Sequence, residues 1–356
     1  MRSEGATLPS FYRPVTIIDV ARQAGLSAST VSRVLNKSGY FSEETLTKVE
    51  AAVEELGYRP NWSARSLRGK PSNLVGLIIP DISNIFYTGV ASSLASSLRD
   101  YQYEMILCVS DEDPEKDLGF LQILEEKRVD GIIYTPPANG DNSACIREMV
   151  ARGIPVVEIN RQRSKDLLDG VLADNLRAVQ QVIEYLHGLG HERIAMISGP
   201  ATVTTGAERL MGYQTAIARA GLPVNPTYLK IGYFTSQFGE EATRALLALE
   251  TPPTAIFAAS NRIALGSLKQ LNQMKVSIPD DLSFVAFDDT EWLEAWNPPI
   301  TTVDIAIDEM AKLVVELLHR RVREKKNLAK PVTYHLSTSM IIRQSCKPLR
   351  PTTDPI

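Results

Sequence analysis

The stretch SASTVSRVLNKSG, residues 27–39, decides how the N-terminal part of the chain folds. Small polar residues occupy its start, and Val31, Val34 and Leu35 follow at a helical spacing. Ser27 can cap such a helix, because its hydroxyl can accept a hydrogen bond from a backbone N–H of the first turn. The stretch therefore predicts a short helix with an apolar face and a polar N-terminal end.

The flanking segments predict two further short helices within residues 16–58. Thr16 can cap the first helix, and Asp19 follows in the capping-box position. Gly25 ends that helix. Ser42 can begin the third helix, and Gly57 can end it.

The first two helices fit a helix-turn-helix motif. Ala21 is small enough for two helices to cross closely, and Gly25 tolerates the left-handed backbone of the turn. Val31 can pack beneath the second helix. In this motif the N-terminal side chains of the second helix point outward, into a DNA major groove. A small three-helix surface domain with another partner is the alternative.

Charge is distributed unevenly along the chain. Residues 13–70 contain nine Lys and Arg but six Asp and Glu, although the whole chain has a net charge of −4. A basic segment in an acidic chain suits a polyanionic partner.

The segment PNWSARSLRGK, residues 60–70, can form a helix of two turns. Helices this short are marginal in water, so we expect it to fold only when bound. Leu67 beside Arg65 and Arg68 suits a wedge in the minor groove. A plain interdomain linker, with Leu67 packed on the body, is the alternative.

Beyond Leu74, apolar strand-like runs alternate with helix-length segments. This alternation predicts an α/β fold with parallel sheets covered by helices on both faces, and the number of strands requires two sheets. The expected strands are residues 74–80, 103–110, 129–135, 154–160, 193–199, 254–260 and 281–288.

Several classes of protein are disfavoured. No apolar run is long enough for a membrane helix, and the N-terminus has no export signal, so we expect a cytoplasmic protein without a membrane partner. Cys108, Cys145 and Cys346 are scattered, as in a reducing compartment. GxSxG, GxGxxG and P-loop motifs are absent. His187 and His191 are four residues apart, but glycines interrupt the helix, so we do not expect a metal site there. Because the catalytic and nucleotide-binding motifs are also missing, we expect neither a cofactor nor enzymatic activity.

The segment VTIIDVARQAGLSASTVSRVLNKSG and its continuation to Gly69 closely resemble the headpiece and hinge of the LacI–GalR family of bacterial transcription regulators. RVDGIIY, GHERIAMISGP, RLMGYQTA, VAFDD and PPITTVD match later signatures of the family in order. The resemblance covers residues 15–345. It implies a repressor that binds a pseudo-palindromic, double-stranded operator as a homodimer.

By position, the resemblance implies that Ala28, Ser29 and Arg33 of the second helix read bases. It implies that Thr30, Ser32 and Asn36 contact the DNA backbone or flanking groups. The hinge would bend DNA by inserting a leucine pair. The expected DNA-binding residues are Thr16, Ser27, Ala28, Ser29, Thr30, Ser32, Arg33 and Asn36 in the headpiece, and Ala64, Leu67 and Arg68 in the hinge.

The remaining chain resembles periplasmic sugar-binding proteins, in which two α/β subdomains enclose a cleft. This implies a headpiece at residues 15–59, a hinge at 60–70, and a body at 71–345. The subdomains would comprise residues 71–172 with 303–335, and residues 173–302 with 336–345. Residues 1–14 and 346–356 are expected to be disordered tails.

Polar residues follow three expected strands at Asn160, Asn261 and Asp288. Ligands in parallel sheets bind beyond these strand ends, where amide and carboxylate groups suit sugar hydroxyls. Helix capping is the alternative for Asn261 and Asp288. The resemblance adds Arg209 as the effector anchor, with a solvated helix face as its alternative. It also adds the rings of Phe86 and Phe234, for which core packing is the alternative.

Two departures from the family pattern concern the ligand. Arg262 stands where relatives carry an acid, which hints at a phosphorylated or acidic sugar. Ile305 and Ile307 replace polar or aromatic contacts of some sugar-responsive members. We expect an effector, a sugar or sugar phosphate, to alter operator affinity through the hinge, as inducer or co-repressor; a protein co-regulator is a further possibility. An exported sugar-binding protein is the rival interpretation, but it would have no use for residues 15–70.

Overall fold

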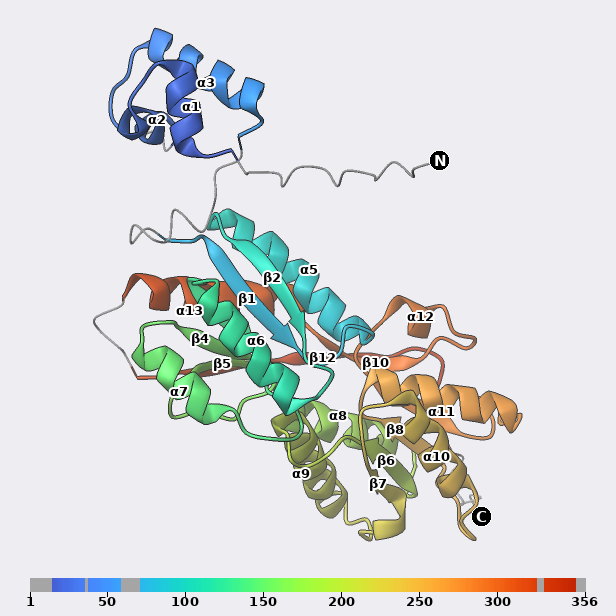
Figure 1. Ribbon diagram of the computed structural model, residues 1–356. Coiled ribbons are helices and arrows are strands. Elements are labelled where there is room, and N and C mark those ends of the chain that lie inside the picture. The colour runs from blue at the N-terminus through green and yellow to red at the C-terminus, as the bar shows by residue number, and fades with distance from the viewer. Residues whose placement is uncertain (1–14, 36–37, 59–70, 325–329, 350–356) are drawn as a thin grey trace, which may run out of the picture. The chain divides into compact units, whose positions relative to one another are not determined.

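A computed structural model describes residues 15–35, 38–58, 71–324 and 330–349 of the chain. The chain divides into two compact units, residues 1–70 and residues 71–356, which we call the headpiece and the body (Figure 1). The expected N-terminal tail, residues 1–14, and the expected hinge, residues 60–70, lie outside the described residues.

The described headpiece is the expected bundle of three helices around a small apolar core. The helices are α1 (Ile17–Ala24), α2 (Ala28–Leu35) and α3 (Glu43–Leu56). The residues buried between them are Val20, Ala21, Val31, Val34, Val49 and Ala52.

Local hydrogen bonds explain where these helices begin and end. Both the backbone N–H and the hydroxyl of Thr16 donate to Asp19 Oδ2, at 2.9 and 2.6 Å. The Thr30 N–H donates to Ser27 Oγ at 3.1 Å, which confirms Ser27 as the cap of α2. Gly25 has φ of 66°, a left-handed conformation that costs glycine little, and it turns the chain from α1 into α2.

The body contains two six-stranded sheets. The first has the strand order β11-β5-β4-β3-β1-β2, and every pairing in it is parallel. Its strands are β1 (Leu74–Ile79), β2 (Glu104–Val109), β3 (Gly131–Tyr134), β4 (Val156–Ile159), β5 (Asp169–Ala173) and β11 (Thr333–Leu336).

The second sheet has the order β12-β10-β9-β8-β6-β7, and only its edge strand β12 is antiparallel to its neighbour among the described strands. The α/β fold class and the seven strands expected from sequence are confirmed. The strands of this sheet are β6 (Ile194–Ser198), β7 (Leu229–Ile231), β8 (Ala255–Ala258), β9 (Ser283–Phe287), β10 (Thr301–Ile305) and β12 (Thr338–Ile341).

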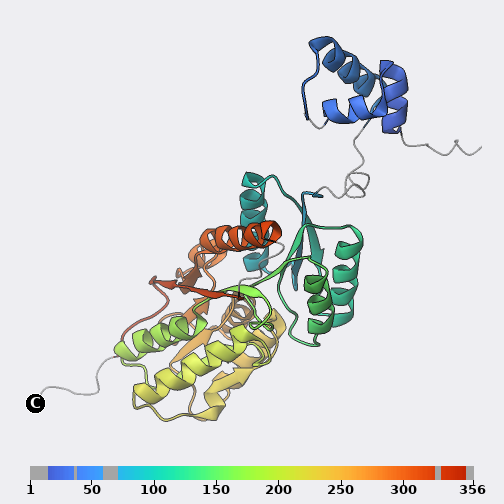
Figure 2. The same cartoon turned by 90° about the vertical axis from the view of Figure 1, so that its left-hand side faces the viewer.

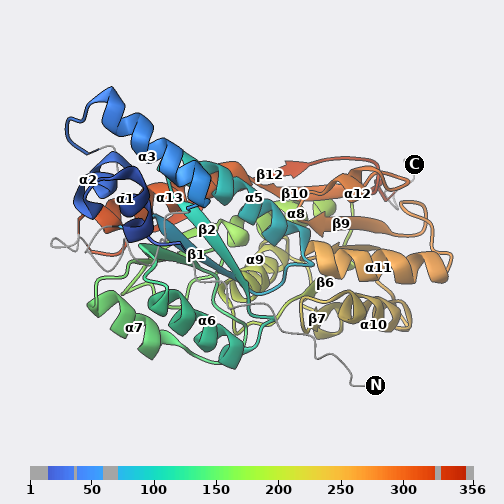
Figure 3. The same cartoon turned by 45° about the horizontal axis from the view of Figure 1, so that its top comes forward.

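Helices cover both faces of the first sheet. The helices α5 (Ile85–Asp100) and α13 (Ile307–Arg323) lie side by side on one face (Figure 2). The helices α6 (Pro114–Glu126) and α7 (Ser143–Ala151) lie on the other (Figure 3). We call this sheet and its helices the first subdomain.

The second sheet is covered in the same way. One core cluster includes α8 and α9, and a separate cluster includes α10 and α11. This sheet and its helices form the second subdomain. The helices are α8 (Asn175–Gly188), α9 (Thr204–Arg219), α10 (Ser236–Leu247), α11 (Asn261–Gln273) and the short α12 (Glu291–Glu294), with a 3-10 turn, η1 (Pro226–Tyr228).

The chain passes between the subdomains three times. It crosses after β5, after β10 and between β11 and β12. The expected boundaries near residues 172, 303 and 335 would cut through these strands. Val303, for example, pairs with Met340 inside the second sheet. The crossings therefore lie a few residues further along the chain.

The C-terminal boundary also differs from the expectation. The sequence places residues 346–356 in a tail, but the backbone N–H of Lys347 donates to Ser283 Oγ at 3.1 Å. The N–H of Leu349 donates to the Leu189 carbonyl at 2.9 Å. Residues 346–349 therefore belong to the second subdomain, because these bonds attach them to its core strand β9 and to the end of α8. Residues 350–356 lie outside the described residues.

Within the described ranges, no helix has both the length and the apolar character needed to cross a membrane.

Candidate DNA-binding and ligand-binding sites

The N-terminal end of α2 presents hydroxyl groups to solvent. Ser27, Ser29 and Arg33 are exposed, while Ala28 and Thr30 are half-buried. Ser27 Oγ lies 2.8 Å from both Ser29 Oγ and Thr30 Oγ1. Because Val31 and Val34 point into the core, the opposite face of the helix is the one available to a partner.

Other residues expected at the DNA interface are less accessible or lie elsewhere. Thr16 and Ser32 are half-buried, and Thr16 is engaged with Asp19. Tyr40, which was not among the expected contacts, is 99% exposed in the loop between α2 and α3. The remaining expected DNA contacts, Asn36, Ala64, Leu67 and Arg68, lie outside the described residues.

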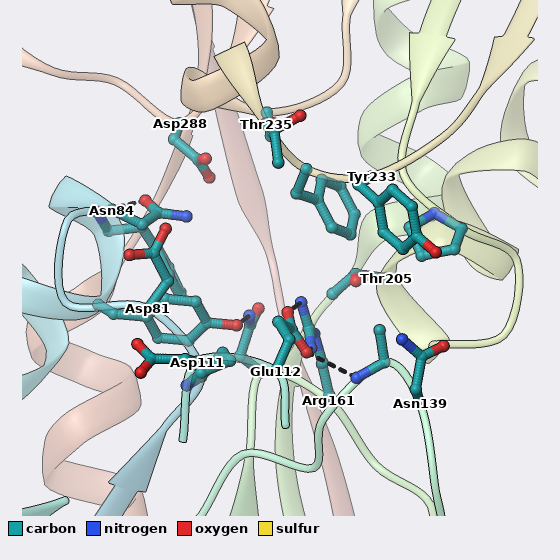
Figure 4. Close-up of a pocket in the computed structure, with 18 of the residues that line it drawn as sticks. Asp81, Asn84, Asp111, Glu112, Asn139, Arg161, Thr205, Tyr233, Thr235 and Asp288 are labelled. Carbon is teal, nitrogen blue, oxygen red and sulfur yellow. Dashed lines mark hydrogen bonds and ion pairs between the residues drawn. The ribbon is translucent and has the colours of Figure 1, made fainter. Parts of the chain in front are cut away.

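A cavity of about 340 Å³ lies between the two subdomains (Figure 4). Its wall combines strand-end loops of the first sheet with loops and helix starts of the second. Five of the six residues expected to contact an effector line it, namely Phe86, Asn160, Arg209, Phe234 and Asp288.

Asn261, the sixth, lies behind this wall. Its side-chain amide donates to Asp288 Oδ2 at 2.7 Å and to Asn84 Oδ1 at 2.9 Å. The helix-cap alternative for Asn261 is wrong, because the hydroxyl of Ser260 caps α11 by accepting the Ile263 N–H. Asn261 instead connects Asn84 of the first subdomain to Asp288 of the second.

Asn160 and Asp288 follow β4 and β9 in left-handed conformations, with φ of 64° and 69°. Asparagine and aspartate adopt this region more readily than other non-glycine residues. The Asn160 amide donates to Tyr87 Oη at 3.1 Å, which fixes its orientation at the cavity. Asp288 does not occupy an N-cap position, since Thr290 does so for α12. Its Oδ2 nevertheless accepts the backbone N–H of Asn261, the first residue of α11, at 3.2 Å, so it contacts a helix N-terminus as the capping alternative expected.

Arg209 extends from α9 into the cavity wall and is 4% exposed. Its Nε donates to Asn175 Oδ1 at 2.9 Å and its Nη1 to the Ala259 carbonyl at 2.5 Å. The guanidinium lies 3.6 Å from the centre of the Phe287 ring. Burial lowers the pKa of Arg209 to about 10, so it remains protonated at neutral pH. The alternative of a solvated helix face is therefore wrong.

Arg161 and Glu112, neither of which was expected from sequence, form an ion pair between a buried guanidinium and a half-buried carboxylate. Arg161 Nη1 and Nη2 lie 3.0 and 2.9 Å from the two Glu112 carboxylate oxygens. Burial alone would lower the pKa of Arg161, but the nearby Tyr87 and Glu112 outweigh it and raise the pKa. Both side chains of the pair line the cavity.

Aromatic rings form two parts of the wall. Phe86 packs edge-on against Tyr87, with ring centres 5.2 Å apart, and belongs both to the wall and to the core. The Phe234 ring lies directly over Gly199, where a Cβ atom would be 2.0 Å from its Cζ. Phe234 also lies 5.7 Å from the Arg161 guanidinium.

The two departures from the family pattern lie outside the cavity wall. Arg262 is absent from the lining residues, and its Nε lies 3.9 Å from Asp81 Oδ2. Ile305 is buried in the core, and the half-buried Ile307 packs against the same core cluster. The hint of an anionic ligand at Arg262 therefore finds no support in its position.

Further hydrogen bonds cross between the subdomains beside the cavity. The hydroxyl of Thr204, at the start of α9, accepts the Gln162 N–H at 2.8 Å and donates to the Gln162 carbonyl at 2.9 Å. The Thr202 hydroxyl donates to the Ala138 carbonyl at 3.3 Å. We call the arrangement in which these bonds join the two subdomains the closed arrangement.

The two histidines four residues apart lie in the last turn of α8 and in the loop that follows it. His191 is buried, and its Nδ1 lies 3.0 Å from Thr254 Oγ1. Burial also lowers its pKa. Among the described residues, no three His, Cys, Asp or Glu side chains are grouped as metal ligands.

Comparison with known proteins agrees with this geometry. Residues 16–61 match the family described as bacterial regulatory proteins, lacI family, and residues 183–346 match a periplasmic binding protein-like domain. The chain is 34% identical over 335 residues to the HTH-type transcriptional regulator DegA of Bacillus subtilis, covering 94% of this chain and 98% of DegA. It is 36% identical over 337 residues to a ribose operon repressor of Halalkalibacterium halodurans, covering 93% and 97%.

Two solved structures are similar to this chain over 94% of its length. The lac repressor dimer bound to operator and the anti-inducer ONPF has a TM-score of 0.82 at 25% identity, covering 94% of this chain and all of that chain. The complex of the transcriptional regulator CelR with cellobiose has a TM-score of 0.70 at 29% identity, with the same coverage. These relatives are regulators and not enzymes. The chain belongs to the lacI family of bacterial regulatory proteins and is a transcription regulator.

Proposed function

We propose that the chain is a homodimeric repressor whose affinity for its operator is set by a small molecule in the cavity. One observation carries this proposal: a single chain combines a headpiece with an exposed polar recognition surface and a body with a cavity lined by charged, amide and aromatic side chains. Its relatives include a repressor solved as a dimer on operator DNA and a regulator solved with a sugar. A repressor of this kind would act on genomic DNA in the cytoplasm.

In this proposal, α2 reads the operator from the major groove. Ser29 and Arg33 are exposed and can donate to base edges, and the Ala28 methyl can contact a thymine methyl. Thr16, Ser27, Thr30 and Ser32 would contact phosphates, which position the headpiece without reading sequence. Two headpieces, one from each protomer, would read two half-sites. Asn36 and the hinge residues Ala64, Leu67 and Arg68 would add flanking and minor-groove contacts.

The cavity suits a ligand rich in hydroxyl groups, such as a sugar. Asp288 and Asn160 offer carboxylate and amide groups, and Phe86 and Phe234 offer flat apolar surfaces for a ring. The ligand would bind against both subdomains, so its affinity depends on how they are arranged. A ligand that favours one arrangement shifts the population toward it, and operator affinity changes through the hinge.

Selection of duplexes from a random pool tests the DNA-binding half of the proposal. We expect the full-length protein to enrich a palindrome, and we expect Arg33→Ala to relax the preference at one position of each half-site, which corresponds to about 1–3 kcal/mol. Arg177→Ala is the matched control, because Arg177 is also exposed but pairs with Glu184 on the body helix α8. Enrichment that is no greater than for bulk DNA, or a motif without symmetry, would overturn the proposal.

A further inference from the structure

The ion pair between Arg161 and Glu112 has two unequal members. Arg161 is 3% exposed, whereas the Glu112 side chain is 32% exposed. The close-up of the cavity shows the two side chains next to each other in its lower wall (Figure 4). Bidentate arginine–carboxylate pairs of this kind use the same guanidinium edge that would otherwise bind a phosphate or carboxylate ligand.

Glu112 is held in this position by its surroundings. Its φ of 57° follows a φ of 55° at Asp111, and two consecutive left-handed residues other than glycine are unfavourable. Glu112 Oε2 also accepts the Ala138 N–H at 2.6 Å, and Arg161 donates to the Pro136 carbonyl at 3.2 Å. The pair therefore joins the loops that follow β2, β3 and β4, and backbone strain of this kind is characteristic of functional sites.

The other charges of the cavity do not favour an anion. Asp288 is hydrogen-bonded to the amide of Asn261, and Asp81 to the N–H and hydroxyl of Ser83. Both partners are neutral, although Asp81 also lies 3.9 Å from Arg262, behind the wall. Arg209 is the opposing cation, and two of its nitrogens already donate to Asn175 and Ala259.

We propose that Glu112 sets the charge class of the ligand: by neutralising Arg161 it reserves the cavity for an uncharged, hydroxyl-rich compound. Without Glu112, the buried guanidinium is an uncompensated charge, which a bound anion would relieve. The cavity would then accept a phosphorylated or carboxylated ligand. This inference rests on the proposed ligand-binding role of the cavity.

The test compares full-length wild-type protein with Glu112→Gln, using inorganic phosphate and ribose 5-phosphate as probes. Binding is measured without DNA by calorimetry and by the midpoint of thermal unfolding. We expect Glu112→Gln to bind both probes at least about tenfold more tightly than the wild type. Because a bound ligand stabilises the folded state, the midpoint reports binding even if the variant is less stable.

Two further variants make the test specific. Glu115→Gln makes the same charge change at an exposed site on the first turn of α6 and should leave phosphate binding unchanged. The double variant Arg161→Gln/Glu112→Gln replaces the ion pair by a neutral pair, which should fold and should lose the gained affinity.

Three results would overturn the inference: equal binding of the probes by wild type and Glu112→Gln, the same gain in Glu115→Gln, or a gain that survives in the double variant. The operator selection separates this failure from that of the proposed function. If an operator is found and a neutral compound controls it while the phosphate gain is absent, only the role of Glu112 is wrong. If Glu112→Gln gains affinity for the phosphate probes but no compound controls DNA binding, the proposed regulation is wrong.

Discussion

At the scale of single residues, buried carboxylates shape the loops around the cavity. Glu158, on β4, is fully buried, and its carboxylate accepts the backbone N–H groups of Arg163 and Ser164 at 3.1–3.2 Å. The loop that these bonds hold begins with Asn160 and Arg161 at the cavity. Glu158 is therefore a positioning residue beneath the site and does not line it.

Glu158 predicts a specific pH dependence of stability. Burial raises its pKa from 4.5 to about 7. The raised pKa belongs to the folded state, so the protonated carboxyl contributes to the free energy of unfolding. This contribution is complete below pH 4.5 and is lost as the pH rises through 7. We expect Glu158→Gln to gain about 3 kcal/mol in free energy of unfolding relative to wild type across this interval. Urea denaturation at several pH values measures it.

The exposed Glu115→Gln variant is the control for the loss of one carboxyl group outside this loop. Parallel pH profiles for wild type and Glu158→Gln would contradict this account of Glu158.

Part of the site could be predicted from single residues. Asn160 and Asp288 directly follow apolar strands, and parallel strands end at one edge of a sheet, so the pattern made both candidates for the cavity. For Asp288 the family resemblance decided between this role and helix capping. Arg209 came from the family resemblance. The pair of Arg161 with Glu112 joins loops 49 residues apart. The strand-end argument brings both loops to one edge of the sheet, but no pattern shows which side chains pair across it, so only the folded structure could reveal the ion pair.

At the scale of elements, the turn between α1 and α2 sets the geometry of the recognition surface. Gly25 has φ of 66°, and a Cβ atom added there would meet no other atom within 4 Å. Any cost of substitution is therefore one of backbone conformation and not of packing.

We expect Gly25→Ala to destabilise the headpiece by about 1–2 kcal/mol, the cost of a left-handed conformation for alanine. Gly25→Asn is the matched control and should lose less, because asparagine visits this region readily. Hydrogen exchange of the headpiece amides in the full-length protein measures the difference. Equal protection in the two variants would show that the left-handed turn is not what stabilises the motif.

Element prediction succeeded where the apolar pattern was long and failed where it was short or polar. The seven expected strands are continuous apolar runs. β7 has three residues, and β10, TTVDI, is mostly polar although it is buried inside the second sheet. Its threonines are satisfied by neighbouring groups, such as Arg343 N–H donating to Thr301 Oγ1 at 3.0 Å. Such tertiary partners are invisible to a pattern of hydrophobicity.

For the body as a whole, the account depends on hydrogen bonds that cross between the subdomains. Asn261 joins Asn84 to Asp288, and Thr204 makes two bonds to the backbone of Gln162. These contacts stabilise the closed arrangement in which the cavity has walls on both sides.

Thr204→Val should weaken closure, because valine has the same shape but leaves both Gln162 backbone groups unpaired. Loss of two hydrogen bonds, at about 0.5–1.5 kcal/mol each, costs about 1–3 kcal/mol, so ligand affinity should fall roughly 5- to 150-fold. Calorimetry with a cavity ligand measures this change. Thr215→Val is the control, because its bond to Gln180 lies within the second subdomain. Equal losses in the two variants would show that the Thr204 contact has no special role in closure.

The central claim is that the cavity and the headpiece are thermodynamically linked. The measurement that tests it most directly is the affinity of the full-length protein for its selected operator, without and with a saturating cavity ligand. We expect operator affinity to change roughly 5- to 150-fold, and ligand affinity to change by the same factor when operator is bound. An operator affinity that is identical at zero and saturating ligand would contradict the account.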